Sequence, residues 1–450
     1  MGANRFMIVL LVLLLGFVGM GVTEEMGIHL SSTDIHLAQS YIEHEDILIE
    51  SNTDFATQGW LGSGTESNPY IIEWLNITGH GGYGIRIYTT DVYCIIRHCI
   101  IQTFYGGTAT GIHLAYAKNV EIDDCDIHVD GYGATFAWSQ YCSIRDSRIK
   151  WASKGINSID SSNCIAEDNI IWEMDQIGIN LWLCDRWTVQ NNTIYDAFHQ
   201  QGIYCRESER MEIDGNTIWN AKHEGIFIES SDSVTVTENT VHHVGPSTAS
   251  SDTGHGIRAL DSEGIQILDN SIYNNSGNGI LAESDLATIE GNLIHNNEGH
   301  GVMIDGASRV EVKNNDIFWN EKYGVYMTNA ALCDIYGNRV AKNRQGEAYD
   351  DQTQEGLWNA WDDRISTGNS WGDYSGTGTY LIDGPAGAVD NYPEQQVSTP
   401  TQLTSTQPTP TEGNEFDFGV ISIVVTVASV GCIALFLILI LRFRIRSSNV

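Results

Sequence analysis

Three carboxylates recur at one fixed offset from a repeated glycine, and they are the residues best placed to do chemistry. Glu229, Glu283 and Asp305 each lie four residues after such a glycine. If these glycines mark equivalent points of strands stacked about 4.8 Å apart, the carboxylates lie roughly 5 to 10 Å apart. That range suits the carboxylate pairs of enzymes that cleave glycosidic bonds. Glu229, Glu283 and Asp305 are therefore candidate catalytic residues of a carbohydrate-active site.

Aromatic, basic and imidazole side chains accompany these carboxylates. Histidine and arginine can orient a substrate or stabilise a developing negative charge. Histidines shortly before the glycines, together with His199, suggest a ridge along one edge of a groove. The competing interpretation is structural, because an exposed strand face is polar anyway and a histidine before a glycine can simply end a turn. The candidate substrate-binding residues are Tyr204, Arg206, His223, His255, Arg258, His300 and Tyr326.

A repeat must position these side chains. Glycine followed by Ile, Val or Ala recurs at positions 84, 111, 133, 155, 178, 202, 225, 256, 279, 301 and 324. Such a fixed period is typical of a solenoid. The longest step inserts HHVGPSTASSDTGH before Gly256, and loops on rigid scaffolds are where binding residues concentrate.

Within each repeat, apolar residues two apart, such as Ile226 and Ile228, predict short strands with inward-pointing side chains. An in-phase column of asparagines fits a turn in which each amide bonds backbone groups of adjacent coils, which is a structural role. We therefore expect an all-β, single-stranded parallel β-helix of about eleven or more coils. The asparagines of this ladder are Asn169, Asn192, Asn216, Asn239, Asn270, Asn292, Asn315 and Asn338.

The flanks of the repeat predict caps and a membrane anchor. Residues 23–83 form an N-terminal segment and cap, and residues 84–343 hold the repeats. Residues 344–396 form a C-terminal cap rich in aromatic residues, namely Trp358, Trp361, Trp371, Tyr374 and Tyr380. Residues 1–22 have the pattern of a signal peptide. Residues 397–419 have the composition of a Ser/Thr/Pro stalk, and residues 420–441 are long and apolar enough for a transmembrane helix. Arginines in the tail, 442–450, mark the cytoplasmic side. The sequence thus predicts a type I single-pass protein of the cell membrane with an extracellular β-helix.

The net charge limits the classes of ligand that the chain could bind, and the cysteine positions bear on whether disulfides form. The formal net charge of −35 disfavours nucleic acid and polyuronate ligands. Most of the nine cysteines fall on ladder positions whose geometry suits disulfides poorly, so we favour buried free thiols. Zinc-type spacing is absent from the sequence, and no metal ligand is assigned. Asn76, Asn191 and Asn274 open glycosylation sequons, which are plausible on an exported chain.

Three segments flank the repeats, namely NPYIIEWLNITGHGGYGIRIYTTDVYCIIRHC, AWDDRISTGNSWGDYSGTG and DNYPE. In these segments and in the repeats, the chain resembles the NosD-like β-helix proteins with carbohydrate-binding and sugar-hydrolase repeats. The likeness covers roughly residues 45–395 and implies a right-handed, pectin-lyase-like β-helix of the archaeal cell-surface type. Members often carry an acidic insert that suggests calcium as a cofactor. Here the insert is shortened to DYSGTGTYLIDG, which leaves Asp373 and Asp383 as candidate ligands.

Three functions remain open. The leading hypothesis is a glycan-binding or envelope surface module that uses the outer face of the strand after each repeat glycine. The second is a polysaccharide lyase, epimerase or glycoside hydrolase on that face. The third is copper handling, which the family name implies and for which the histidine ridge is the supporting feature.

Overall fold

The computed structural model describes residues 41–79, 81–245 and 254–395. The expected signal peptide, stalk, transmembrane segment and tail lie outside these residues, as does most of the loop inserted before Gly256. Within the described ranges, no helix has the length and apolar character to cross a membrane.

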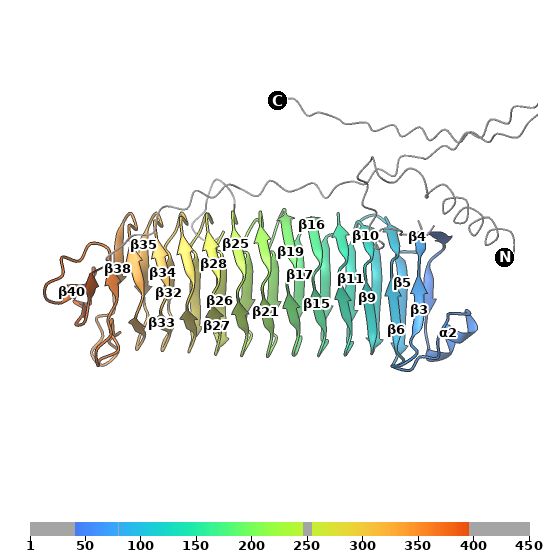
Figure 1. Cartoon of the computed structure of the whole chain (residues 1–450), viewed down its shortest axis with the longest axis horizontal. Coiled ribbons are helices and arrows are strands. Elements are labelled where there is room, and N and C mark those ends of the chain that lie inside the picture. The colour runs from blue at the N-terminus through green and yellow to red at the C-terminus, as the bar shows by residue number, and fades with distance from the viewer. Residues whose placement is uncertain (1–40, 80, 246–253, 396–450) are drawn as a thin grey trace, which may run out of the picture. The chain divides into compact units, whose positions relative to one another are not determined.

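The described strands pair in parallel and in register to form three sheets of 15, 13 and 12 strands (Figure 1). From β1 to β38 each strand pairs with the strand three places further along the chain, so one coil contributes one strand to each sheet, and β37 then pairs with β39. We call the 15-stranded sheet A, the 13-stranded sheet B and the 12-stranded sheet C. This topology is the β-helix that the glycine period predicts.

Sheet B follows the repeat glycines and contains β2 (Ile47–Ile49), β5 (Tyr83–Thr90), β8 (Thr110–Ala117), β11 (Tyr132–Ala137), β14 (Lys154–Ile159), β17 (Ile177–Trp182), β20 (Ile203–Arg206), β23 (Ile226–Glu229), β26 (Ile257–Glu263), β29 (Ile280–Asp285), β32 (Val302–Asp305), β35 (Tyr323–Thr328) and β38 (Gly346–Asp350). Sheet C contains β3 (Tyr70–Glu73), β6 (Cys94–Arg97), β9 (Val120–Asp123), β12 (Ser143–Arg145), β15 (Ile165–Glu167), β18 (Thr188–Gln190), β21 (Glu212–Asp214), β24 (Thr235–Thr237), β27 (Gln266–Leu268), β30 (Thr288–Glu290), β33 (Glu311–Lys313) and β36 (Asp334–Tyr336).

Sheet A contains β1 (Ile42–His44), β4 (Leu75–Gly79), β7 (Ile100–Thr103), β10 (Asp126–Val129), β13 (Arg148–Lys150), β16 (Ile170–Met174), β19 (Thr193–Ala197), β22 (Thr217–Trp219), β25 (Thr240–His242), β28 (Ser271–Tyr273), β31 (Leu293–His295), β34 (Asp316–Phe318), β37 (Arg339–Ala341), β39 (Ser370–Trp371) and β42 (Glu394–Gln395). A short helix, α2 (Asn52–Thr57), and an antiparallel pair, β40 (Tyr380–Leu381) and β41 (Val389–Asp390), complete the described elements.

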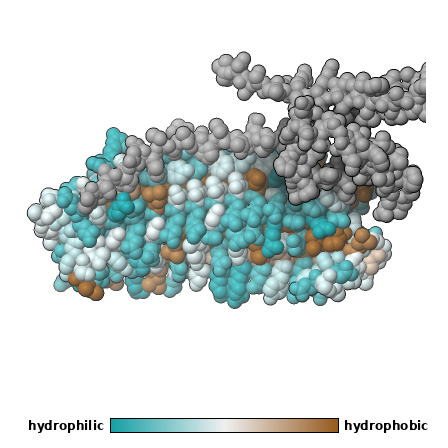
Figure 2. Space-filling view, viewed as in Figure 1, coloured by the Kyte–Doolittle hydropathy of each residue, from teal (hydrophilic) through white to brown (hydrophobic). Residues whose placement is uncertain are grey.

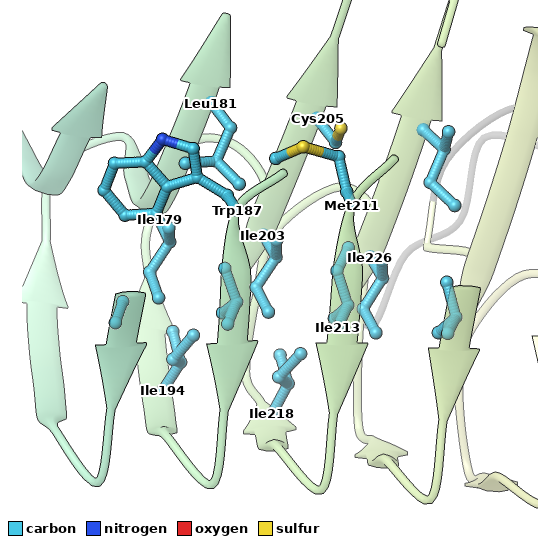
Figure 3. Packing of buried hydrophobic residues seen from close by; sticks show 14 of the residues in the cluster. Ile179, Leu181, Trp187, Ile194, Ile203, Cys205, Met211, Ile213, Ile218 and Ile226 are labelled. Carbon is cyan, nitrogen blue, oxygen red and sulfur yellow. The ribbon is translucent and has the colours of Figure 1, made fainter. Parts of the chain in front are cut away.

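The core consists of columns of like residues that run along the coil axis. Ile179, Ile203 and Ile226 lie in register on successive strands of sheet B and are fully buried (Figure 3). Ile194 and Ile218 form the matching column of sheet A. Because every second strand residue points inward, this alternation buries one apolar side chain after another along each sheet.

Tight packing explains why a glycine stands near the start of the sheet B strands from β5 to β35. A Cβ atom on Gly202 would lie 2.5 Å from Cγ2 of Ile218 and 2.7 Å from the carbonyl oxygen of Gly225. Other repeat glycines meet the same two kinds of atom. The repeat glycine therefore marks the corner of the coil at which there is no room for a side chain.

The asparagine column expected from the sequence is a continuous hydrogen-bonded ladder between sheets C and A. The backbone N–H of Asn216 donates to Oδ1 of Asn239 at 2.9 Å, and the N–H of Asn239 donates to Oδ1 of Asn270 at 2.9 Å. Towards the N-terminus, Ser147 and Cys125 occupy the same column, and the ladder continues to Asn369 at the other end. The eight predicted asparagines are all almost completely buried.

Two further ladders were not expected. Serine hydroxyls between sheets B and C accept N–H groups of the preceding coil, as in Ser208 to Ser231 at 3.0 Å. A second asparagine column runs from Asn275 to Asn343 between sheets A and B. All three corners of the coil thus satisfy their buried backbone groups with stacked polar side chains.

The coils extend beyond the expected repeat boundaries of 84 and 343. β1 and β2 already pair with β4 and β5, and β38, β39 and β42 continue sheets B and A. The early coils lack the repeat spacing because a segment that includes α2 is inserted between their strands.

The C-terminal cap buries Trp361 and Trp371, and Trp371 stacks on Tyr380 with ring centroids 4.3 Å apart. Trp358 does not join this closure, since its side chain is 47% exposed. The eight cysteines of the described residues are all buried and unpaired, as free thiols in ladder columns would be.

Candidate functional site

The outer face of sheet B carries the candidate residues in two columns. In-register pairing stacks residues two places after each glycine into a first outer column, and residues four places after it into a second. We call these columns, from β20 to β38, the sheet B face. The first column is Tyr204, Phe227, Arg258, Leu281, Met303, Tyr326 and Tyr349. The second column is Arg206, Glu229, Leu260, Glu283, Asp305 and Thr328.

Glu229 lies against a tyrosine and an arginine of the preceding coil. The hydroxyl of Tyr204 donates a hydrogen bond to Oε2 of Glu229, and Nε of Arg206 lies 3.6 Å from the same oxygen. The Tyr204 ring stacks on Phe227 at 5.2 Å. Burial, and then the hydrogen bond to Glu229, raises the pKa of Tyr204 well above its usual value. Tyr204 therefore stays protonated and acts as a donor at neutral pH.

Arg258 lies at the centre of the face and is held by two glutamates. Its Nε atom lies 2.6 Å from Oε2 of Glu283, and Nη1 lies 3.8 Å from Oε1 of Glu224. The guanidinium also lies 5.2 Å from the ring centroid of Phe227. Burial lowers the pKa of Arg258, but the hydrogen bond to Glu283 and the charges of Glu283, Glu224 and Glu229 outweigh it and leave the pKa raised. Glu224, a buried acid directly before a repeat glycine, is not among the candidate residues selected from the sequence.

The four histidines do not form one ridge. His255 and His300 directly precede their glycines, whereas His223 lies two residues before Gly225 and His199 lies further back, so their side chains leave the coil at different points. Nδ1 of His255 accepts the N–H of Asn278 at 3.0 Å, and Nδ1 of His300 accepts the N–H of Tyr323 at 3.2 Å.

Both of these histidines are nearly buried, at 2% and 6% exposure. Burial, and then the charge of Lys322, lowers the pKa of His300 to about 3. His255 and His300 are therefore held in the turn between sheets A and B as hydrogen-bond acceptors. This is the structural interpretation that the sequence left open.

A second group of rings lies further along the face. His300 stacks on Tyr326 at 4.3 Å, and Tyr326 stacks on Tyr349 at 4.8 Å. Tyr323 lies 5.4 Å from Tyr349. The ring pair of Tyr204 and Phe227 and this second group thus bound a strip in which charged and apolar side chains alternate with one another.

The three candidate carboxylates are spread along this strip rather than gathered at one point. Glu229 pairs with Leu260 and Leu260 with Glu283, so the two glutamates lie two coils, or roughly 9.6 Å, apart. Asp305 follows Ile304, which pairs with Ala282, so Asp305 and Glu283 occupy adjacent coils. Oδ1 of Asp305 makes a 3.5 Å contact with the Asn329 amide. Glu283 and Asp305 are therefore the closest candidate pair.

Metal chemistry receives no support from a ligand cluster. No group of three or more His, Cys, Asp or Glu side chains placed to hold a metal ion occurs in the described part of the chain. The candidate calcium ligands Asp373 and Asp383 instead hydrogen-bond the hydroxyls of Tyr380 and Tyr323.

The three sequons differ in their surroundings. Asn191 is exposed at a turn, whereas Asn76 and Asn274 are half-buried. The Asn76 amide donates to Glu43 at 2.8 Å, and the Asn274 amide contacts His243 at 3.3 Å. Asn191 is thus the best placed of the three for modification.

Comparison with known proteins identifies the family. The right handed beta helix region family matches residues 62–241, 132–282 and 244–359. These matches cover well over half of the chain, which therefore belongs to this family, and the right-handed parallel β-helix predicted from the sequence is confirmed. Curated proteins give no match.

Solved structures share the fold at low identity. A double mutant of the periplasmic alginate epimerase AlgG is 15% identical, with a TM-score of 0.50 over 70% of this chain and 83% of that chain. The mannuronan C-5 epimerase AlgE6 A-module of Azotobacter vinelandii is 13% identical, with a TM-score of 0.49 over 68% and 85%. PfbA, a surface adhesin of Streptococcus pneumoniae, is 12% identical, with a TM-score of 0.40 over 67% and 77%. At these identities the likeness shows the fold alone.

Proposed function

We propose that this chain is a glycan-binding module displayed outside the cell, and that the sheet B face is its binding surface. The observation that carries the proposal is the strip bounded by two ring groups. Phe227 and Tyr326 lie four coils apart in register, a distance of about 19 Å along the axis. Exposed surface of aromatic rings can pack on sugar C–H groups, and the tyrosine hydroxyls and charged groups between them can bond sugar hydroxyls.

The charges of the face favour an uncharged glycan. The Arg258 guanidinium is already held by Glu283 and Glu224, and Arg206 by Glu207 and Glu229. These cations are therefore not free to bind the carboxylates of an acidic polysaccharide. The formal charge of −35 adds a general repulsion of polyanions.

Binding is proposed ahead of catalysis because two of the candidate carboxylates already have partners on the protein. Glu229 accepts from Tyr204, and Glu283 is ion-paired with Arg258. A carboxylate held in this way is a poor proton acceptor for a substrate. The strip is therefore better suited to hold a glycan than to change it.

One observation supports the enzyme alternative. The Tyr204 hydroxyl and the Glu229 carboxylate form a hydrogen-bonded donor and acceptor beside Arg206. Such a pair could act as acid and base in a lyase, an epimerase or a glycoside hydrolase.

The display of the module is proposed from the sequence features outside the described residues. A signal peptide, a stalk and one C-terminal span would give a type I membrane protein of the NosD-like, archaeal cell-surface kind. Protease treatment of intact cells should release the β-helix as a soluble fragment. A fragment that appears only after lysis would contradict extracellular display.

A glycan array tests the binding proposal. The full chain, purified in a detergent without sugar headgroups, should bind neutral polysaccharides and not polyuronates. Phe227→Ala with Tyr326→Ala should weaken binding at least tenfold, because both ends of the strip are lost. The matched control is Tyr336→Phe on sheet C, whose hydroxyl bonds Glu311 as that of Tyr204 bonds Glu229. Equal binding by the double variant would refute the proposal.

Turnover is tested on the array hits. We expect binding without product release, measured by new reducing ends and by absorbance of unsaturated sugars. Product release that disappears in Glu229→Gln or Asp305→Asn would establish the enzyme alternative instead.

A further inference from the structure

Neighbouring coils place aromatic residues in the turn between sheets B and C. The first residue after the strands of sheet B has a left-handed backbone, for instance at Asp160 with φ of 50° and Ser230 with φ of 48°. Bulky side chains rarely adopt this conformation. Two successive coils nevertheless place Tyr116, with φ of 52°, near the end of β8 and Trp138, with φ of 50°, directly after β11, at equivalent points of the coil.

The next left-handed position of the same turn shows the same departure. Asn119 and Asn163 stand there in the neighbouring coils, with φ of 58° and 55°. The coil between them carries Tyr141 with φ of 55°.

These rings point to solvent rather than into the core. Tyr116, Trp138 and Tyr141 are 46%, 49% and 60% exposed. Tyr116 and Trp138 stack at 5.0 Å, and the edge of Tyr88 meets Tyr116 at 5.5 Å. On the face of the coils drawn in Figure 2, hydrophilic residues predominate and hydrophobic ones are scattered among them. We call Tyr88, Tyr93, Tyr116, Trp138 and Tyr141 the aromatic patch.

Tyr93 and Tyr141 of this patch line a hollow of about 470 Å³. Tyr93, Asn119 and Tyr141 are equivalent positions of three successive coils, so the two tyrosines lie two coils, or roughly 9.6 Å, apart. The amide of Asn119 between them donates to the carbonyl oxygen of Asp91 at 2.9 Å, which draws it towards the preceding coil. The spacing leaves room for one ring between the two tyrosines.

The lining of the hollow combines aromatic and polar groups. Tyr93 and Tyr141 both line the hollow, and Tyr141 is the more exposed of the two. The Glu121 carboxylate and the Ser143 hydroxyl supply polar partners, and the lining holds no lysine or arginine. The aromatic column on sheet A differs, because Tyr195 and its neighbour Trp219 cover each other's faces at 4.6 Å.

We infer that the aromatic patch and its hollow form a second binding site, which takes a neutral pyranose unit of a glycan. A pyranose has apolar C–H faces that pack on aromatic rings and hydroxyls that bond a carboxylate, an amide and a hydroxyl. The site lies on the turn between sheets B and C and shares no residue with the sheet B face. It therefore does not depend on the proposed function of that face.

The test measures binding of named probes to the full chain in a detergent without sugar headgroups. The probes are hexamers of β-1,4-linked glucose, mannose and N-acetylglucosamine, titrated calorimetrically. At least one should bind, and Trp138→Ala and Tyr141→Ala should each weaken its affinity tenfold or more. Tyr141→Phe should retain affinity, because the ring face is kept.

A matched control separates the patch from a general effect of losing a surface ring. Trp151 is also 49% exposed and has a left-handed φ of 65°, but it lies beyond sheet A against His128 and Phe104. Trp151→Ala should leave the affinity of the aromatic patch for the probe unchanged. Phe227→Ala and Tyr326→Ala, which change the sheet B face, should also leave that affinity unchanged. An equal loss in Trp151→Ala, or binding that survives Trp138→Ala with Tyr141→Ala, overturns the inference.

A second copy of the chain is the other occupant that the measurement can reveal. Light scattering of the unliganded chain should show no change of oligomeric state between the wild type and Tyr141→Ala. Self-association that Tyr141→Ala abolishes, together with no binding of the three probes, would replace the glycan with a protein partner and overturn the inference.

Discussion

Replacing Asn239 by alanine removes five hydrogen bonds from the middle of the asparagine ladder. The Asn239 amide donates to the carbonyl oxygens of Ile213 and Thr237, both at 2.8 Å, and to Oδ1 of Asn270 at 3.0 Å. Its Oδ1 accepts the backbone N–H and the side-chain amide of Asn216, both at 2.9 Å. The residue is fully buried, so water cannot replace these partners without rearrangement.

The expected loss is larger than that of an ordinary hydrogen bond because two backbone groups become unsatisfied. The orphaned N–H and the orphaned C=O, at about 1 to 3 kcal/mol each, give a loss of roughly 2 to 6 kcal/mol. Asn239→Ser should lose less, because Ser147 fills the same column naturally and its hydroxyl accepts the N–H of Cys125 at 3.1 Å. We therefore expect Asn239→Ala to be more destabilised than Asn239→Ser.

The assay is equilibrium denaturation of the purified chain, with the midpoint and slope compared between variants. A matched control is Thr188→Ala, which removes one exposed contact at 3.5 Å and should change stability by about 0.5 kcal/mol or less. A loss below about 1 kcal/mol for Asn239→Ala, or a serine variant as unstable as the alanine variant, would refute the ladder argument.

Three further predictions follow from the packing and the buried side chains. Gly202→Ala should destabilise the fold by about 1 to 3 kcal/mol or more, because the added Cβ would clash with Ile218 and Gly225. Gly306→Ala should cost only about 1 kcal/mol in the same denaturation assay, because Gly306 has a φ of +69° but open space around it. The folded-state pKa of His300 is lowered to about 3, so its contribution to stability is present above its unfolded pKa of about 6.5 and is lost as pH falls towards 3. His300→Asn, which copies Asn278 of the neighbouring coil, should flatten the loss of stability between pH 7 and 4, and an unchanged profile would contradict the assignment. Tyr204→Phe should weaken glycan binding on the sheet B face, while Tyr336→Phe on sheet C should not, as measured by titration with an array hit.

The repeat was readable from the sequence because two of its physical constraints allow few residue types. No side chain fits at the corner occupied by Gly202, and the ladder turn needs an amide that both donates and accepts, as Asn239 does. Each constraint therefore returns once per coil and exposes the period. The serine ladder escaped notice because Ser208 and Ser231 are small polar residues in a polar turn, and their context carries no second marker.

The site was only partly predictable for a related reason. Counting from the glycine correctly placed Tyr204, Glu229, Arg258 and Glu283 on one face. It failed for the histidines, because a shift of one or two residues before the glycine changes the direction in which a side chain leaves the coil. The ion pairs of Arg258 with Glu224 and Glu283 join three different coils, and no single repeat shows them.

The dependence of affinity on glycan length tests the central claim most directly. If a neutral glycan spans the strip from Phe227 to Tyr326, about 19 Å, affinity should rise steeply until the chain reaches roughly four to five sugars and then level off. The rise should vanish when either Phe227→Ala or Tyr326→Ala removes one end. Affinity that is independent of length, or a length dependence unchanged in both variants, would contradict a glycan lying along the sheet B face.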